Sequence, residues 1–115
     1  MPVSPATYNI RPQRRADFLL NVQFKDAAGT PINLSGWSVY ASCYDKERVN
    51  KYGDFVVTIT SASTGTVQLK LGYAITATLP LSGTAHYDVM LVSPTGLREF
   101  YLEGLVRASE GYTTP

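Results

Sequence analysis

Residues 55–71 read FVVTITSASTGTVQLKL, and this stretch decides the class of the fold. Apolar and polar residues alternate on both sides of a segment rich in serine and threonine, which ends at Gly65. Alternation with a period of two is typical of a β-strand with one buried face, and a glycine between two such runs is typical of a turn. The stretch therefore predicts a β-hairpin. Its buried face is expected to carry Phe55, Val57, Ile59, Val67, Leu69 and Leu71.

The same alternation recurs along most of the chain. Clusters of Gly, Pro, Ser and Asp separate the apolar runs, as at residues 26–29 and 93–96, and such clusters are typical of turns. Many short strands at short intervals indicate a sandwich rather than alternating helices and strands. The sequence predicts an all-β, immunoglobulin-like antiparallel β-sandwich of about seven to eight strands with extended terminal arms. The other predicted strands lie within residues 16–25, 37–44, 86–92 and 97–108.

A length of 115 residues suits one domain, 1–115, with one core. We expect the core of the sandwich to span about 16–108. The arms, 1–15 and 109–115, lack the apolar alternation needed to pack on their own sandwich, so we expect them to be loose.

Trp37 opens a predicted strand with small inward residues behind it, so we expect it to anchor the core. Cys43 shares its face and is interpreted as an inert, buried thiol, the alternative being a reactive one. Residues 45–54 are rich in Lys, Glu, Arg and Asn, which predicts a solvated loop. Residues 73–79 are too short for an independent helix and are expected to form a bridging turn.

The last predicted strand places Phe100, Leu102 and Val106 on one face. Gly104 lies between them, and a glycine inside a strand indicates a bulge or a close approach of another backbone.

Composition limits the possible partners. The chain is 44% hydrophobic and 17% charged, with a net charge of +1, so we expect a folded protein that binds neither nucleic acid nor a membrane. The single cysteine cannot form an intrachain disulfide, and the start of the chain shows no signal-peptide pattern. We expect synthesis in a reducing cytoplasm.

No catalytic constellation is visible, so we expect no enzyme and no small-molecule substrate. The only histidine, His86, lies in mid-strand without a neighbouring nucleophile motif. Glu99 and Glu103 would share a strand face about 13 Å apart, beyond the roughly 5–9.5 Å between glycosidase carboxylates. One Cys and one His cannot supply a structural zinc site, and no calcium or phosphate-binding loop is present, so no metal or cofactor is predicted.

The candidate docking residues come from the arms and from tyrosines. The basic stretch 11–15 could contact an acidic partner or form a solvated connection, and outward tyrosines suit an interface or an ordinary strand surface. We expect at least one arm to become ordered on a neighbouring copy or another protein. The candidates are Tyr8, Ile10, Arg11, Arg14, Arg15, Tyr40, Tyr44 and Tyr112.

Three stretches carry a family resemblance. They are INLSGW at 32–37, GTVQLKL at 65–71, and YDVML at 87–91 continuing through PTGL at 94–97 to LEG at 102–104. Together they resemble the small β-sandwich proteins of tailed-bacteriophage virions and are similar to the N-terminal domain of phage baseplate upper proteins. The resemblance implies core positions at Trp37, Tyr87 and Leu91 and docking through strand faces or arms. A baseplate upper protein continues into a stalk, whereas this sequence stops at Pro115, which favours an adaptor, tail or decoration subunit.

The resemblance implies a non-enzymatic structural subunit of tail, neck, baseplate or capsid, located in the virion and made in the bacterial host cytoplasm. Its expected partners are other virion proteins and neighbouring copies of itself. The alternative is a carbohydrate-binding module for host adhesion with an aromatic platform of Tyr40, Tyr44 and Tyr52.

Overall fold

The computed structural model describes residues 6–45, 47–80 and 84–110. These residues form an all-β chain with one helical turn, α1 (Tyr73–Thr76). The strands are β1 (Ala6–Thr7), β2 (Phe18–Gln23), β3 (Ser38–Tyr44), β4 (Lys51–Asp54), β5 (Val56–Ser61), β6 (Thr66–Leu71), β7 (Ala85–Val92) and β8 (Arg98–Val106).

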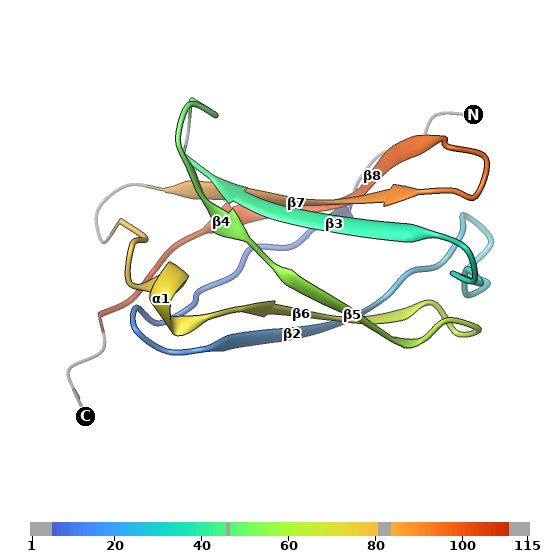
Figure 1. Cartoon of the computed structure of the whole chain (residues 1–115), viewed down its shortest axis with the longest axis horizontal. Coiled ribbons are helices and arrows are strands. Elements are labelled where there is room, and N and C mark those ends of the chain that lie inside the picture. Colours follow the sequence, from blue (N-terminus) through green and yellow to red (C-terminus); the bar gives the residue numbers. More distant parts are fainter. Residues whose placement is uncertain (1–5, 46, 81–83, 111–115) are drawn as a thin grey trace.

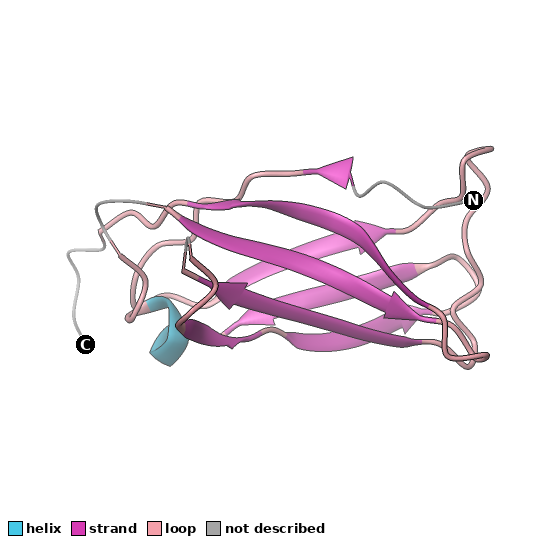
Figure 2. Ribbon diagram, turned by 90° about the horizontal axis from the view of Figure 1, so that it is seen from above, coloured by secondary structure: helices cyan, strands magenta, loops and turns pink. Residues whose placement is uncertain are grey.

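The strands form two packed sheets, which confirms the predicted sandwich. One sheet has the order β1-β8-β7-β3-β4 and the other the order β2-β6-β5 (Figure 1). Apart from β1, the strands correspond in order to the GFCC′ and BED strands of immunoglobulin-like domains. Every pairing is antiparallel except that of β1, which runs parallel to β8 along one edge (Figure 2).

The core lies between the two sheets and confirms the predicted inward residues of β2, β3, β6 and β7. Cys43 is fully buried, as expected. Trp37 does not anchor the core, because it lies just before β3 and is only partly buried at the core's rim. The residues with no exposed surface include Val67, Leu69, Leu71, Val89 and Leu91.

The segment predicted as one long loop is shorter than expected. Its last residues, Lys51–Asp54, form β4, which pairs with the end of β3. The chain then passes to the other sheet as β5. Buried Phe55 lies at the crossing, where its N–H donates to the carbonyl of Ala41 at 2.9 Å. Residues 26–29 and 93–96 form the predicted turns, with Gly29 and Gly96 at positive φ.

The prediction of a loose N-terminal arm is wrong for residues 6–15. This segment continues alongside β8, and the N–H of Ile10 donates to the carbonyl of Leu105 at 2.9 Å. Ile10 is only 3% exposed, so it belongs to the core, and Pro12 is fully buried. The exposed polar residues Asn9, Arg11 and Gln13 alternate with these two inward ones, so the segment packs on its own sandwich through a single apolar face.

A bulge in β8 reverses the predicted orientation of Phe100. Met90 pairs with Phe100 but Val89 pairs with Leu102, so Tyr101 is the extra residue. Tyr101 turns inward against the core residue Phe24, with ring centroids 6.0 Å apart. Phe100 consequently faces out and is 46% exposed. The bulge also separates Glu99 and Glu103, which therefore do not share a face as predicted.

Gly104 marks a close approach of another backbone, one of the two predicted alternatives. A Cβ atom at this position would lie 2.0 Å from the carbonyl oxygen of Tyr8. The Tyr87 hydroxyl donates a hydrogen bond to that same oxygen from inside the sandwich. The absence of a side chain at Gly104 thus allows the N-terminal segment to pack closely against β8.

Candidate interaction face

The outer face of the five-stranded sheet carries a row of large apolar side chains, which we call the aromatic row. It consists of Tyr40, Met90 and Phe100, which are direct cross-strand neighbours on β3, β7 and β8. Tyr40 is 57% exposed and Phe100 is 46% exposed. Isolated exposed apolar residues are ordinary, but three neighbours in one row across three strands form a patch of the kind that marks interaction sites.

A second row lies immediately beside the first, and we call it the carboxylate row. Asp54, Ser42, Asp88 and Glu103 are successive cross-strand neighbours on β4, β3, β7 and β8. The carboxylate of Asp54 is neutralised locally: Lys51 lies 2.6 Å from it and the Ser42 hydroxyl donates to it at 2.6 Å. These two hydrogen bonds lower the pKa of Asp54.

Asp88 and Glu103 are compensated less, by the nearby guanidinium of Arg48. They face each other directly across β7 and β8, and like charges in that position repel. Burial raises the pKa of Asp88, the positive charge of Arg48 lowers it, and the charge of Glu103 raises it by a smaller amount. Among the described residues, neither carboxylate makes a salt bridge. The row therefore presents excess negative charge to whatever covers it.

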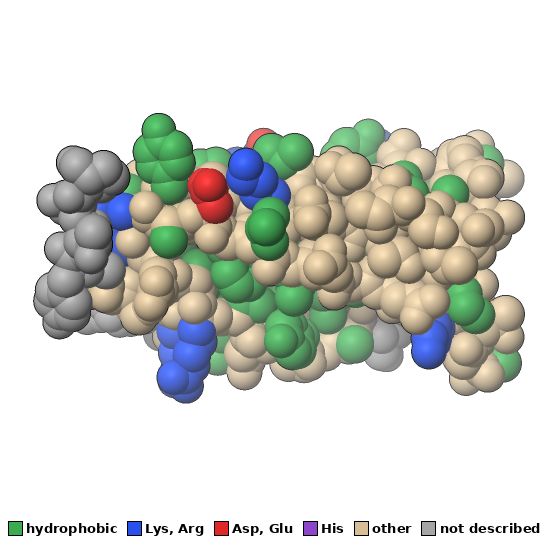
Figure 3. Space-filling model, turned by 90° about the horizontal axis from the view of Figure 1, so that it is seen from below, with side chains coloured by type: hydrophobic (Ala, Val, Ile, Leu, Met, Phe, Trp, Pro, Cys, Tyr) green, Lys and Arg blue, Asp and Glu red, His purple; other side chains and the backbone are tan. Residues whose placement is uncertain are grey.

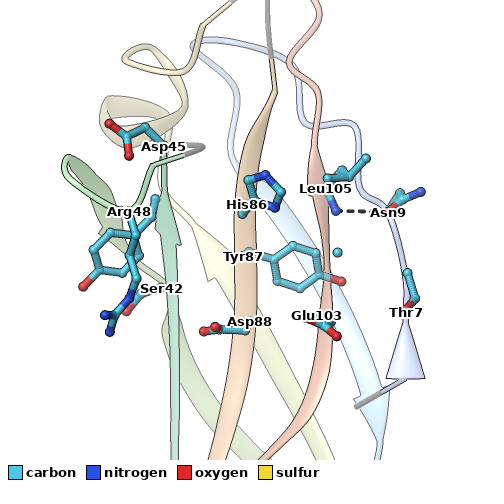
Figure 4. A pocket seen from close by; sticks show the side chains of 12 residues that line it. Thr7, Asn9, Ser42, Asp45, Arg48, His86, Tyr87, Asp88, Glu103 and Leu105 are labelled. Carbon is cyan, nitrogen blue, oxygen red and sulfur yellow. Dashed lines mark hydrogen bonds between the residues drawn. The ribbon is translucent and has the colours of Figure 1, made fainter. Parts of the chain in front are cut away.

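The carboxylate row borders a shallow hollow of about 490 Å³. Figure 4 shows Asp88 and His86 on β7 in the middle, Ser42 and Arg48 on one side and Glu103 on the other. The Arg48 guanidinium lies 5.6 Å from the ring centroid of Tyr44, a cation–π distance. The hollow combines an aromatic ring, the guanidinium of Arg48 and carboxylates.

The arrangement does not form a metal site. In residues 6–45, 47–80 and 84–110, no three His, Cys, Asp or Glu side chains gather closely enough to hold a metal ion. His86 pairs in register with Tyr44 and Leu105 on the exposed surface. In the part of the chain that the structure describes, no nucleophile is hydrogen-bonded to it.

The outer face of the three-stranded sheet has a different chemistry. Figure 3 shows this face, where side chains other than charged ones predominate. Its cross-strand rows run through Asn21, Gln68 and Thr58, with exposed Leu19 and Val56 on either side of Lys70. This face therefore carries amides, hydroxyls and the cation of Lys70 in place of the aromatic row and carboxylates of the other.

The structure separates the sequence-predicted docking residues. Tyr40 and Tyr44 lie on the outer face of the five-stranded sheet, whereas Tyr52 packs against the core, so the platform of three tyrosines is not formed. Phe100 and Met90 join Tyr40 instead. Sequence reasoning missed Phe100 because the bulge is invisible in a run of three apolar residues.

The arm residues have mixed positions. Tyr8 and Arg11 are exposed, but Ile10 is buried and cannot dock a partner. Arg14 and Arg15 both pair with Glu110, at 3.1 Å and 3.4 Å, and so connect the N-terminal segment to residues after β8. Tyr112 lies outside the described residues.

Comparison with known proteins leaves the function open. No protein-family model matches the chain, and no curated protein sequence matches it. The only helix in the described part is a single turn, and none there has the length and apolar character for crossing a membrane.

Proposed function

We propose that this chain is a non-enzymatic structural subunit of a tailed-bacteriophage virion, made in the host cytoplasm and assembled with other virion proteins and copies of itself. The carrying observation is the exposed aromatic row, Tyr40, Met90 and Phe100, beside the carboxylates of Asp88 and Glu103 on one sheet face. Aromatic residues and methionine are enriched at protein interfaces. The sequence resemblance to phage sandwich proteins supports the virion as the setting.

The first experiment is an inventory of purified particles of the phage that encodes the chain, by mass spectrometry with copy-number determination. We expect the protein in every particle at a fixed copy number that reflects particle symmetry. Absence from washed, infectious particles would refute the proposal. A second experiment uses the exposed side chains of Tyr40 and Phe100. The double variant Tyr40→Ser with Phe100→Ser should fold normally but fail to be incorporated into particles. The control variant Leu19→Ser with Val56→Ser, on the opposite sheet, should be incorporated.

A carbohydrate-binding module is the second candidate. The hollow brings together Tyr44, the guanidinium of Arg48 and carboxylates. Sugar-binding sites use a similar mixture of aromatic and polar groups. A glycan array with the purified protein tests it. Binding that is lost in Tyr44→Ser and kept in Leu19→Ser would favour adhesion over assembly.

A further inference from the structure

We propose that the outer face of the five-stranded sheet packs against the same face of a second copy, with the two-fold axis running along the aromatic row. This inference rests on the proposed function, because the same face is the interface in both proposals. It adds to that function by naming a second copy of the chain as the partner. It is argued from the order of charges on the face and from the twist of the sheet.

The charges on β8 lie on opposite sides of the aromatic row. Arg98 pairs with Val92, one row from Phe100 toward the β7–β8 turn. Glu103 pairs with Asp88, one row from Phe100 in the other direction. The face therefore has a cation on one side of an apolar centre and excess negative charge on the other. Among the described salt bridges, none involves Arg98 or Glu103.

A two-fold axis along the row exchanges these two sides. Rotation about this axis reverses the strand direction and leaves each strand's place across the sheet unchanged. Arg98 of one copy then lies over Glu103 of the other, and the reciprocal pair forms at the same time because the interface is isologous. The aromatic rows meet each other at the centre, where interfaces are most apolar. A two-fold axis along the strands would instead bring the carboxylate rows together.

The twist of the sheet suits the same axis. Figure 1 shows that β3 lies above β8 at the end where β4 begins and below β8 at the end of the β7–β8 turn. The raised corners of the face are thus diagonal to each other. Rotation about the row places each raised corner over a lowered corner of the partner, as in aligned packing of twisted sheets.

The face is also large enough. Seen onto the sheet face, as in Figure 2, the molecule measures 43 Å by 22 Å, since the 30 Å axis runs through both sheets. A standard interface buries about 800 Å² on each partner, which is less than one broad face of that size. The pairing also brings Arg98 of the second copy to Glu103, which makes no salt bridge among the described residues of a single copy.

Charge exchange tests this geometry on the full chain. Arg98→Glu places two carboxylates together at each end of the interface, and Glu103→Arg places two guanidinium groups together. Either change alone should weaken the dimer by about a hundredfold in sedimentation velocity, since each appears twice in an isologous interface. The double variant Arg98→Glu with Glu103→Arg should recover the dimer, because the pairs are rebuilt with opposite polarity.

Mixing the two single variants gives the sharpest readout. A copy with Arg98→Glu carries only negative groups at both sites, and a copy with Glu103→Arg carries only positive ones. The mixture should therefore form a heterodimer although each variant alone is monomeric. Lys70→Glu makes the same change of charge on the opposite sheet and should leave the dimer intact, and circular dichroism should show native folding for every variant.

Three results would overturn the proposal: a wild-type chain that stays monomeric throughout a concentration series, a dimer that survives both single changes, or a mixture of the variants that stays monomeric. None of these would refute the proposed virion function, which is decided by the particle inventory. A dimer that forms by this geometry in a protein absent from particles would refute the function and leave the inference standing.

Discussion

At the scale of single residues, Cys43 shows how burial sets chemistry. The side chain has no exposed surface, and burial raises its pKa from 9.0 to about 12. We therefore expect the native thiol to resist alkylation at neutral pH, because both access and thiolate are lacking. Labelling with a thiol reagent, followed by mass spectrometry, checks this. The same protein in denaturant should label fully, and rapid labelling without denaturant would contradict the burial.

The raised pKa also links Cys43 to alkaline stability. The folded state holds the thiol proton more tightly than the unfolded state, so this contribution to stability is complete below pH 9 and is lost as the pH rises toward about 12. We expect wild-type stability to fall more steeply above pH 9 than that of Cys43→Ala. Urea denaturation midpoints across an alkaline pH series measure the difference. If stability falls equally with pH in both proteins, the raised pKa of Cys43 is contradicted.

Gly104 gives a second prediction at this scale. An alanine Cβ would lie 2.0 Å from the Tyr8 carbonyl oxygen, so the N-terminal segment must move. We expect Gly104→Ala to lower the free energy of unfolding by about 1–3 kcal/mol. Gly72→Ala is the matched control, because a Cβ there meets nothing within 4 Å. Chemical denaturation compares the stabilities of the two variants. Equal midpoints would show that a Cβ atom at position 104 does not destabilise the fold.

At the scale of elements, the interior strands were predictable and the edges were not. In β6 the inward residues alternate strictly with polar ones, and in β7 the outward His86 and Asp88 fix the phase before the apolar run 89–92, so the period of two shows which face is buried. In β8 three apolar residues in succession, 100–102, fit either phase, and only pairing with β7 shows the bulge. β4 is rich in charged and polar residues because it is a short edge strand, which made it resemble a loop.

The N-terminal segment shows the same limit. Ile10 and Pro12 alternate with Arg11 and Gln13, but two inward residues in a stretch rich in arginine and proline are a weak signal. Their burial depends on β8, more than ninety residues later in the chain, and on a glycine that admits their backbone. Gly104 indicates a bulge or the close approach of some backbone, but nothing in the local sequence identifies the N-terminal segment as that backbone.

The packed segment leads to a prediction that reverses the sequence-based expectation of a loose arm. Ile10→Ala removes a side chain that is 97% buried in the core, so unfolding should become easier by about 2–5 kcal/mol. Arg11→Ala, the exposed neighbour, should change stability little. Urea denaturation monitored by circular dichroism measures the stability of both variants. Equal midpoints for the two variants would mean that the N-terminal segment does not belong to the folded core.

At the scale of the whole molecule, the candidate site depends both on the direction in which each side chain points and on the register between strands. The sequence identifies Tyr40 as outward, but the aromatic row exists only because the bulge turns Phe100 to the same face. The carboxylate row likewise needs the register of four strands to bring Asp54, Asp88 and Glu103 into one line. A single sequence gives the face of each side chain within a strand and not the alignment between strands, so the site could not be predicted.

The two ends of the chain and the two sheets are coupled, which predicts cooperative unfolding. Arg14 and Arg15 pair with Glu110, the N-terminal segment lies along β8, and β4 continues into β5 across the sheets. No part of the described chain has a core of its own, so one transition should unfold all of it. Trp37, the only tryptophan, lies at the core's rim, and its fluorescence reports packing while circular dichroism reports the strands. The two probes should give the same urea midpoint and slope. Separate midpoints would show that one sheet or the N-terminal segment unfolds independently, because a two-state chain allows only one.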